Sequence, residues 1–374
     1  MRFFNLDLHI GVIGDIKQIF RSLGHEVTDW TISGHSWVLG RSMDPVDVIR
    51  ADNWKTIDSA MCDAFYARYK SELDAYDGFI VTHTPCFSML YEKWQKPIIC
   101  VASTRYEQPF SAARAAWDYF NAFLRTSIDN GMLIPIANNK YDAAYAELFT
   151  ERAWQVIPSI CAYTDAPYTG THTKSLLFTK FTQVPAIPGL MRKDHAFHEG
   201  LLSRIARKFG DQQLRRGYSW KDIAAFRSVV VIPYNASIMS IFEMYTSSIP
   251  MLFPSLPLLA ELYRSHHAHG ILSELSMNQV MGMAPGSRIP CGSMDPNNYA
   301  DTDVMMKWMA KADYYDPENM AGLVYFDSFR ELHNLLEDID VTEIHRVMAD
   351  HHVVRKQRVL SAWKNVLRTV ASRI

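Results

Sequence analysis

Short apolar runs alternate along the first half of the chain with longer segments in which apolar residues recur every three or four positions. The short runs predict strands buried on both faces of a sheet, and the helical spacing predicts amphipathic helices. Strands that alternate with helices indicate a parallel, doubly wound sheet. The predicted strands lie at 2–8, 25–32, 78–82, 96–102, 133–137 and 154–158, and the predicted helices at 10–23, 54–76, 87–94, 111–130 and 141–149.

The pattern is interrupted near residues 162–173, where Tyr, Thr, Asp, Pro, Gly and His residues accumulate and predict a linker. It then resumes and predicts a second doubly wound domain. At the end of the chain, 341–374 is polar with helical spacing, and Trp363 is its apolar anchor. In the second domain we expect strands at 175–179, 229–232 and 251–253, and helices at 198–209 and 219–225.

The segment from Ser228 to Ser255 is the most specific part of the sequence. An apolar β-branched run precedes a small polar loop, and a predicted helix then carries Glu243 in its first turns, with Ser237 or Ser240 as its cap. A second short strand follows. This unit resembles the nucleotide-sugar-binding unit in the second domain of GT-B glycosyltransferases.

The resemblance implies an α/β protein of two Rossmann-like, doubly wound domains facing each other across a cleft. Residues 1–165 would bind the acceptor, 174–345 would bind the nucleotide sugar, and the helix at 346–374 would cross back onto the first domain. The implied activity is transfer of a hexosyl or pentosyl group from a nucleotide-sugar donor to a hydroxyl of a glycan or other acceptor. GT-B enzymes do this without a metal, so no cofactor is expected.

On the donor side, the resemblance implies that Glu243 holds the ribose hydroxyls through charge-assisted hydrogen bonds. The alternative is that Ser240 and Glu243 form a capping box, which needs no ligand. Asn235 and Ser237 precede the helix and would receive the diphosphate. Many retaining GT-B families have a glutamate where this chain has Asn235, and the departure favours an inverting reaction.

Cationic side chains would replace a metal ion in neutralising the departing diphosphate. Lys180 directly follows the first strand of the second domain, and Arg192 lies in the next loop. The alternative is that both are ordinary surface cations. His266, His267 and His269 lie close together but lack the spacing of metal ligands, and they are read as a helix end.

On the acceptor side, His9 stands between the first strand and the first helix. Many inverting GT-B enzymes place a histidine base in this loop, where it deprotonates the acceptor hydroxyl. Asp7 is two residues earlier and would orient it. The alternative is a helix-capping or simply exposed histidine. The nearby glycines do not form GxGxxG, which argues against a dinucleotide-dependent dehydrogenase.

Other polar residues follow the later strands of the first domain. Because ligands of doubly wound sheets bind beyond the carboxyl ends of the strands, we expect these residues to shape the acceptor site. The alternative is that loops are polar in any protein. The candidates are His83, Arg105, Glu107 and Asn139.

Composition narrows the range of partners and compartments. The 374 residues are 48% hydrophobic with a net charge of −2, which provides large cores and does not favour nucleic-acid binding. The five cysteines are unpatterned, which fits a reducing compartment. We find no transmembrane run and no signal peptide, and expect a cytoplasmic protein. The oligomeric state is left open.

Two other functions stay open at the level of sequence. A sugar-nucleotide epimerase of the same fold would act on the donor alone and release an epimer or a free sugar. A non-catalytic nucleotide- or carbohydrate-binding protein would keep the cleft, bind a nucleotide and show no turnover. In that case His9→Ala would leave the affinity for the nucleotide unchanged.

Overall fold

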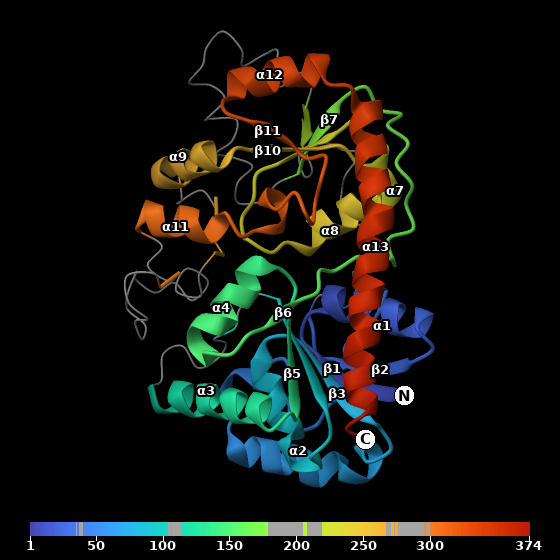
Figure 1. The fold of residues 1–374 in the computed structure, drawn as a ribbon, viewed down its shortest axis with the longest axis vertical. Helices are drawn as coiled ribbons and strands as arrows, with labels where there is room; N and C mark the ends of the chain where they lie inside the picture. Colours follow the sequence, from blue (N-terminus) through green and yellow to red (C-terminus); the bar gives the residue numbers. More distant parts are fainter. Residues whose placement is uncertain are drawn as a thin grey trace. The chain divides into compact units, whose positions relative to one another are not determined.

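The fold is that of a computed structural model (Figure 1). The structure describes residues 1–34, 36, 40–103, 106, 114–178, 205–207, 219–266, 271–272, 274–275, 295–296 and 300–374.

The chain divides into two compact units. Unit 1 contains Met1–Tyr163 together with Gln357–Ile374, and unit 2 contains the described residues from Thr164 to Lys356. Each unit is built around its own parallel sheet. The last helix, α13 (Val341–Ala371), supplies residues to both units.

In unit 1, the strands of the described chain pair in the order β2-β1-β3-β4-β5-β6, all parallel. The strands are β1 (Arg2–Asp7), β2 (Glu26–Thr31), β3 (Gly78–His83), β4 (Ile98–Ala102), β5 (Leu133–Ala137) and β6 (Gln155–Val156). The helices are α1 (Ile10–Ser22), η2 (Trp54–Thr56), α2 (Ser59–Leu73), η3 (Pro85–Trp94), α3 (Arg114–Asp129) and α4 (Lys140–Thr150).

The core of unit 1 lies on both faces of this sheet. Every residue of β3 and β4 is buried, as expected for strands covered on both faces. The end of α13 joins this core: the Trp363 ring packs edge-on against Phe20 of α1, with centroids 5.3 Å apart. Figure 1 shows α1 and the C-terminal part of α13 side by side. The predicted anchoring role of Trp363 is confirmed.

Two predicted helices of unit 1 have a different form. The helix predicted over 54–76 starts as a single 3-10 turn, and α2 begins only after Asp58, whose side chain accepts a hydrogen bond from the Met61 N–H (2.8 Å). This aspartate is a stronger start signal than the apolar spacing before it. The segment predicted as a helix at 87–94 is the 3-10 helix η3.

In unit 2, the described strands pair in the order β11-β10-β9-β7-β8, again all parallel. The strands are β7 (Ser175–Phe178), β8 (Ile205–Arg207), β9 (Val229–Val231), β10 (Met251–Pro254) and β11 (Val324–Phe326). The helices that precede α13 are α7 (Trp220–Ala224), α8 (Met239–Thr246), α9 (Leu256–His266), α11 (Thr302–Met309), η8 (Asp313–Tyr315) and α12 (Phe329–Asp338).

The prediction of a helix over 198–209 is wrong, because β8 lies within it and pairs with β7. Pairing with an edge of the sheet outweighs local helical spacing here. Both sheets are parallel and doubly wound, so the predicted fold class is confirmed in each unit. None of the described helices combines the length and the apolar composition needed to cross a bilayer.

Candidate functional site

The strand order of unit 1 has a switch point between β1 and β3. From β1 the chain passes to β2 on one side and then to β3 on the other. Ligands of doubly wound sheets bind at this point, beyond the carboxyl ends of the strands. His9 follows β1 and His83 ends β3, and their imidazole rings stack in parallel, with centroids 5.4 Å apart and planes 3° from parallel. The topology thus brings together two histidines that are 74 residues apart in the sequence.

His9 occupies the N-cap position of α1 without capping it. Its backbone is extended (φ −140°), and its side chain makes no capping hydrogen bond. The alternative interpretation as a helix-capping histidine is therefore wrong. The residue is partly exposed, so a ligand can reach it. Asp7 is the last residue of β1, but its side chain lies outside the described structure, and its orienting role stays a prediction.

His83 is held in a left-handed backbone conformation, with φ of 70°. This region is costly for a residue with a Cβ, and such residues cluster at ligand sites. The side chain is 5% exposed, and the His83 carbonyl accepts a long hydrogen bond (3.5 Å) from the Ser103 N–H after β4. The backbone thus fixes the direction in which the ring projects beside His9.

The edge continues past His83 to the ends of β4 and β5. Asn138 Oδ1 accepts hydrogen bonds from the backbone N–H and the hydroxyl of Ser159 (2.9 and 2.8 Å). Asn139 Oδ1 accepts from the Asp142 N–H (2.7 Å) and caps α4. Asn139 therefore lies on the same sheet edge as His83, as the acceptor-site prediction requires. Arg105 and Glu107 lie outside the described residues.

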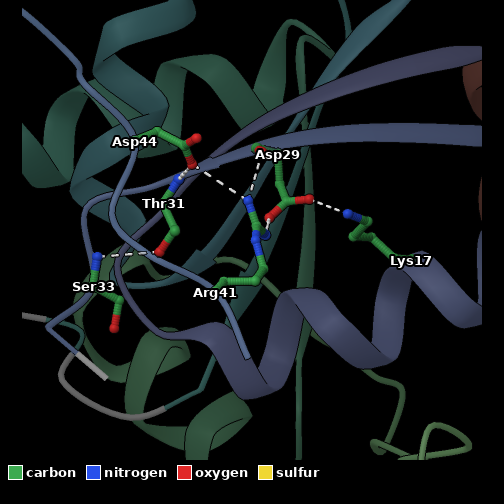
Figure 2. A network of polar contacts seen from close by, with 6 residues as sticks. All are labelled: Lys17, Asp29, Thr31, Ser33, Arg41 and Asp44. Atoms are coloured by element: carbon green, nitrogen blue, oxygen red, sulfur yellow. Dashed lines mark hydrogen bonds and ion pairs between the residues drawn. The ribbon is translucent and has the colours of Figure 1, made fainter. Parts of the chain in front are cut away.

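A charged network adjoins this edge at the end of β2 (Figure 2). The Asp29 carboxylate, 1% exposed, pairs with Lys17 of α1 and Arg41 of the loop after β2. Arg41 also bonds the Asp44 carboxylate (3.3 Å), which accepts the Thr31 N–H (2.7 Å). Because the partners of each charge are protein groups, the network holds the loop after β2 against the sheet.

Unit 2 has its own switch point, between β7 and β9. The loop after β9 contains Asn235, which is 4% exposed. Its Oδ1 accepts the Ala236 N–H (2.7 Å), and its carbonyl accepts the Tyr314 hydroxyl (2.8 Å). These two hydrogen bonds of Asn235 fix the conformation of the loop in which the diphosphate is expected to bind. Lys180 and Arg192 lie outside the described residues.

The helix that carries Glu243 does not begin as predicted. The N-cap of α8 is Ile238, with no side-chain capping bond, so neither Ser237 nor Ser240 caps the helix. Ser240 lies inside the helix, and the Ser240–Glu243 capping box is not the reason for the glutamate. Ser237 lies in the loop that leads into α8, and Glu243 is 6% exposed on the helix.

Arg355, a buried arginine of α13 that was not predicted from the sequence, packs against α8. The Arg355 guanidinium lies over the rings of Phe242 and Tyr245, at 5.7 and 5.6 Å from their centroids. Its Nε donates to Asn319 Oδ1 (2.8 Å), and Asn319 Nδ2 donates to Asp313 Oδ1 (2.5 Å). The two rings flank Glu243 in the sequence, so this contact fixes the helix on both sides of the glutamate.

The two adjacent histidines of α13, His351 and His352, are both partly buried. Tyr245 Oη and His351 Nδ1 are hydrogen bonded (2.7 Å), and Tyr245 also donates to the Ala321 carbonyl (2.9 Å). Burial, followed by the charges of Arg355, Lys356 and His351, lowers the pKa of His352 to about 4. The signal in the sequence was helical spacing: His352, Arg355 and Trp363 lie along one stripe of α13.

Among the described residues, no group of three or more His, Cys, Asp or Glu side chains is placed to hold a metal ion.

Solved structures that are similar to this chain include glycosyltransferases. SnogD from Streptomyces nogalater is 12% identical, with a TM-score of 0.48 over 98% of this chain and 99% of its own. The glycotransferase of kitacinnamycin is 12% identical, with a TM-score of 0.46 over 98% of both chains. CalG4, the calicheamicin glycosyltransferase, is 11% identical, with a TM-score of 0.39 over 100% of this chain and 98% of its own.

No protein-family model matches the chain, and no curated protein sequence matches it. At these identities and TM-scores, the likeness does not assign the chain to a family.

Proposed function

We propose that the protein is a glycosyltransferase that moves a sugar from a nucleotide-sugar donor to a hydroxyl of an acceptor. The proposal is supported chiefly by the position of a few candidate residues near the switch point of each sheet. His9 and His83 stand at that point in unit 1, and Asn235 precedes α8 there in unit 2. Doubly wound sheets bind their ligands at these points.

In this reaction, His9 accepts the proton of the acceptor hydroxyl as the oxygen attacks the anomeric carbon. The bond between that carbon and the phosphate oxygen breaks, and the nucleoside diphosphate leaves with the electron pair. The proton remains on His9 until solvent removes it. One displacement of this kind inverts the anomeric centre. His83, Asn139, Arg105 and Glu107 shape the acceptor side, and Asp7 orients His9.

On the donor side, Glu243 binds the ribose hydroxyls. Asn235, Ser237 and Ser240 bind the diphosphate near the start of α8, and Lys180 with Arg192 neutralises its charge without a metal ion. Glu243 lies inside α8, whose N-cap is Ile238. The transferred group is a hexose or a pentose.

The first test is a thermal-shift screen against UDP, GDP, CMP, dTDP and their sugars, with and without EDTA. A ligand that binds only the folded state raises the melting temperature by mass action. We expect one nucleotide to shift wild type regardless of EDTA, and Glu243→Gln to lose the shift. Glu261→Gln, on the exposed face of α9, is the matched control and should keep it. No shift with any nucleotide would overturn the proposal.

The second test measures transfer. His9→Gln should lower kcat by about 100- to 10,000-fold while leaving nucleotide binding intact. His25→Gln is the matched control, because His25 precedes β2 at the opposite edge of the same sheet. Formation of an epimer or a free sugar without any acceptor would favour an epimerase. Nucleotide binding without any turnover would favour a non-catalytic binding protein.

A further inference from the structure

Two buried polar atoms at the ends of β4 and β5 have no hydrogen-bond partner among the described residues. They are the Ser103 hydroxyl oxygen and the Asn139 side-chain nitrogen, and the residues are 6% and 1% exposed. Buried polar groups in proteins are nearly always paired, because leaving one unpaired costs its full desolvation. The Ser103 and Asn139 groups lie at the carboxyl ends of the strands, where such sheets bind ligands, so a ligand is the expected partner.

The chemistry of the missing partner follows from the cap of α4. Asn139 Oδ1 is already used, because it accepts the Asp142 N–H at 2.7 Å. The free end of the amide is therefore the NH₂ group, which can only donate. The Ser103 hydroxyl can also donate. One ligand oxygen that accepts hydrogen bonds would therefore satisfy both side chains.

The register of the sheet places these two groups near each other. Ala102 of β4 pairs with Ala137 of β5, and the Asn138 N–H donates to the Ala102 carbonyl (3.0 Å). Ser103 follows directly after Ala102, so it lies beside the start of the turn that carries Asn139. His9 lies on the same edge: along β1-β3-β4-β5, Ser103 is two strands from it and Asn139 three.

We propose that Ser103 and Asn139 bind a carbonyl, carboxylate or ether oxygen of the acceptor molecule. This rests on the proposed function, in which His9 binds the reacting hydroxyl. Ser103 lies two strands from β1 and Asn139 three, so spacings of about 4.8 Å place this oxygen roughly 10 to 14 Å from His9. The acceptor is therefore an extended molecule with a second oxygen roughly 10 to 15 Å from its reacting hydroxyl, a span that a single small sugar does not cover. Both atoms are closed off in the ligand-free protein, so a local opening of this edge accompanies binding.

A pair of linear alcohols tests this distance directly, without any donor. The probes are methyl 12-hydroxydodecanoate and methyl 6-hydroxyhexanoate, each compared by calorimetry with the plain alcohol of the same carbon count. We expect the long ester to bind about five-fold more tightly than its alcohol, the size of one net hydrogen bond, and the short ester to show no such gain. Equal affinity of the long ester and its alcohol would overturn the proposal.

Two variants connect the preference to these side chains. Ser103→Ala and Asn139→Asp should each abolish the gain of the long ester, and Asn139→Asp retains the oxygen that caps α4. Ser127→Ala, a buried serine of α3 in the same unit, should keep the gain. The ligand-free Ser103→Ala protein should melt no lower than wild type. A lower melting temperature together with an unchanged ester preference would show a structural partner of the hydroxyl and overturn the proposal.

The nucleotide thermal shift separates this inference from the proposed function. Both variants should keep the wild-type shift, since neither residue belongs to unit 2. A wild-type nucleotide shift without any ester preference would sink the inference and leave the transferase proposal standing. No nucleotide shift at all would remove the transferase on which the inference rests, whatever the esters do.

Discussion

Asp29 of unit 1 and Arg355 of unit 2 are both buried charges, and the two units surround them differently. The Asp29 carboxylate, 1% exposed, is bonded by Lys17 and Arg41, whose own side chains are 33% and 31% exposed (Figure 2). Arg355, also 1% exposed, lies over two aromatic rings and donates to Asn319.

The different surroundings of Asp29 and Arg355 indicate which segment of each unit is held more rigidly. The charges around Asp29 reach water, so the loop after β2 can be released at moderate cost. Arg355 is itself buried: two aromatic rings and the Asn319 amide contact its guanidinium, and Asn319 bonds in turn to Asp313. The helix that carries Glu243 is therefore held more firmly than the loop that borders His9.

The largest effect expected from this comparison is that of Arg355→Met. Loss of the charge-assisted hydrogen bond and of the stacking should lower the free energy of unfolding by about 3 kcal/mol. Hydrogen exchange of the α8 peptide at 239–246 should become faster, as measured by mass spectrometry. Arg355→Lys, which keeps the charge but not the planar fork, should recover little of the loss. Unchanged exchange in α8 would show that the helix does not depend on α13.

The next effect is a dependence of stability on pH that originates in unit 2. The pKa of His352 is lowered from 6.5 to about 4, chiefly by burial. The folded state therefore binds the proton less well than the unfolded state, so stability is complete above pH 6.5 and falls as the pH drops toward 4. The loss should approach roughly 3 kcal/mol. Urea titrations at a series of pH values should show this slope in wild type.

His352→Gln is the matched variant for that slope, and it should flatten the curve between pH 4 and 6.5. An equally steep curve in the variant would assign the acid sensitivity to other groups. Since His352 neighbours Arg355 along α13, the slope also reports on the buried cation of unit 2.

A smaller effect is expected for Asp29→Asn in unit 1. Lys17 and Arg41 can regain water when the carboxylate is lost, so the cost should be about 1 to 2 kcal/mol. The difference between wild type and the variant should shrink as salt is added, because the cations are partly exposed. Urea titrations at low and high salt would measure this. If Asp29→Asn lowered the free energy of unfolding as much as Arg355→Met, the two buried charges would not differ in their contribution to stability.

The smallest effect concerns the start of α8. Ser240 does not cap this helix, so Ser240→Ala should change the free energy of unfolding by less than about 0.5 kcal/mol. In unit 1, Asp58 does cap α2, and Asp58→Ala should cost about 1 kcal/mol. Thermal melts of the two variants would show the difference. A larger loss for Ser240→Ala would restore the capping interpretation of Ser240 and Glu243.

Much of the fold was predictable because its signals are local. The apolar runs that became β3, β4 and β5 are bounded by polar turns, and their order implied parallel sheets. From the same runs it was possible to predict that His9 and His83 each stand at the end of a strand of the first domain. Their parallel stacking was not predictable, because it depends on the positive φ of His83 and on strand order.

Other features depend on contacts between distant residues, which no local pattern records. Ser240 and Glu243 match a capping box, but the backbone starts α8 at Ile238 instead. Arg355 reads as a surface cation until Phe242 and Tyr245 are seen beneath it, more than a hundred residues earlier in the chain. The strand β8 forms only because β7 offers an edge for pairing.

The division of α13 between the units has a consequence for the order of events during synthesis. Unit 1 needs Trp363 against Phe20, yet about 190 residues separate Tyr163 from the returning segment at Gln357. At translation speeds of about 5 to 20 residues per second, the ribosome spends roughly 10 to 40 s on that interval. During this time the nascent first unit exposes the apolar surface of α1 that Trp363 later covers.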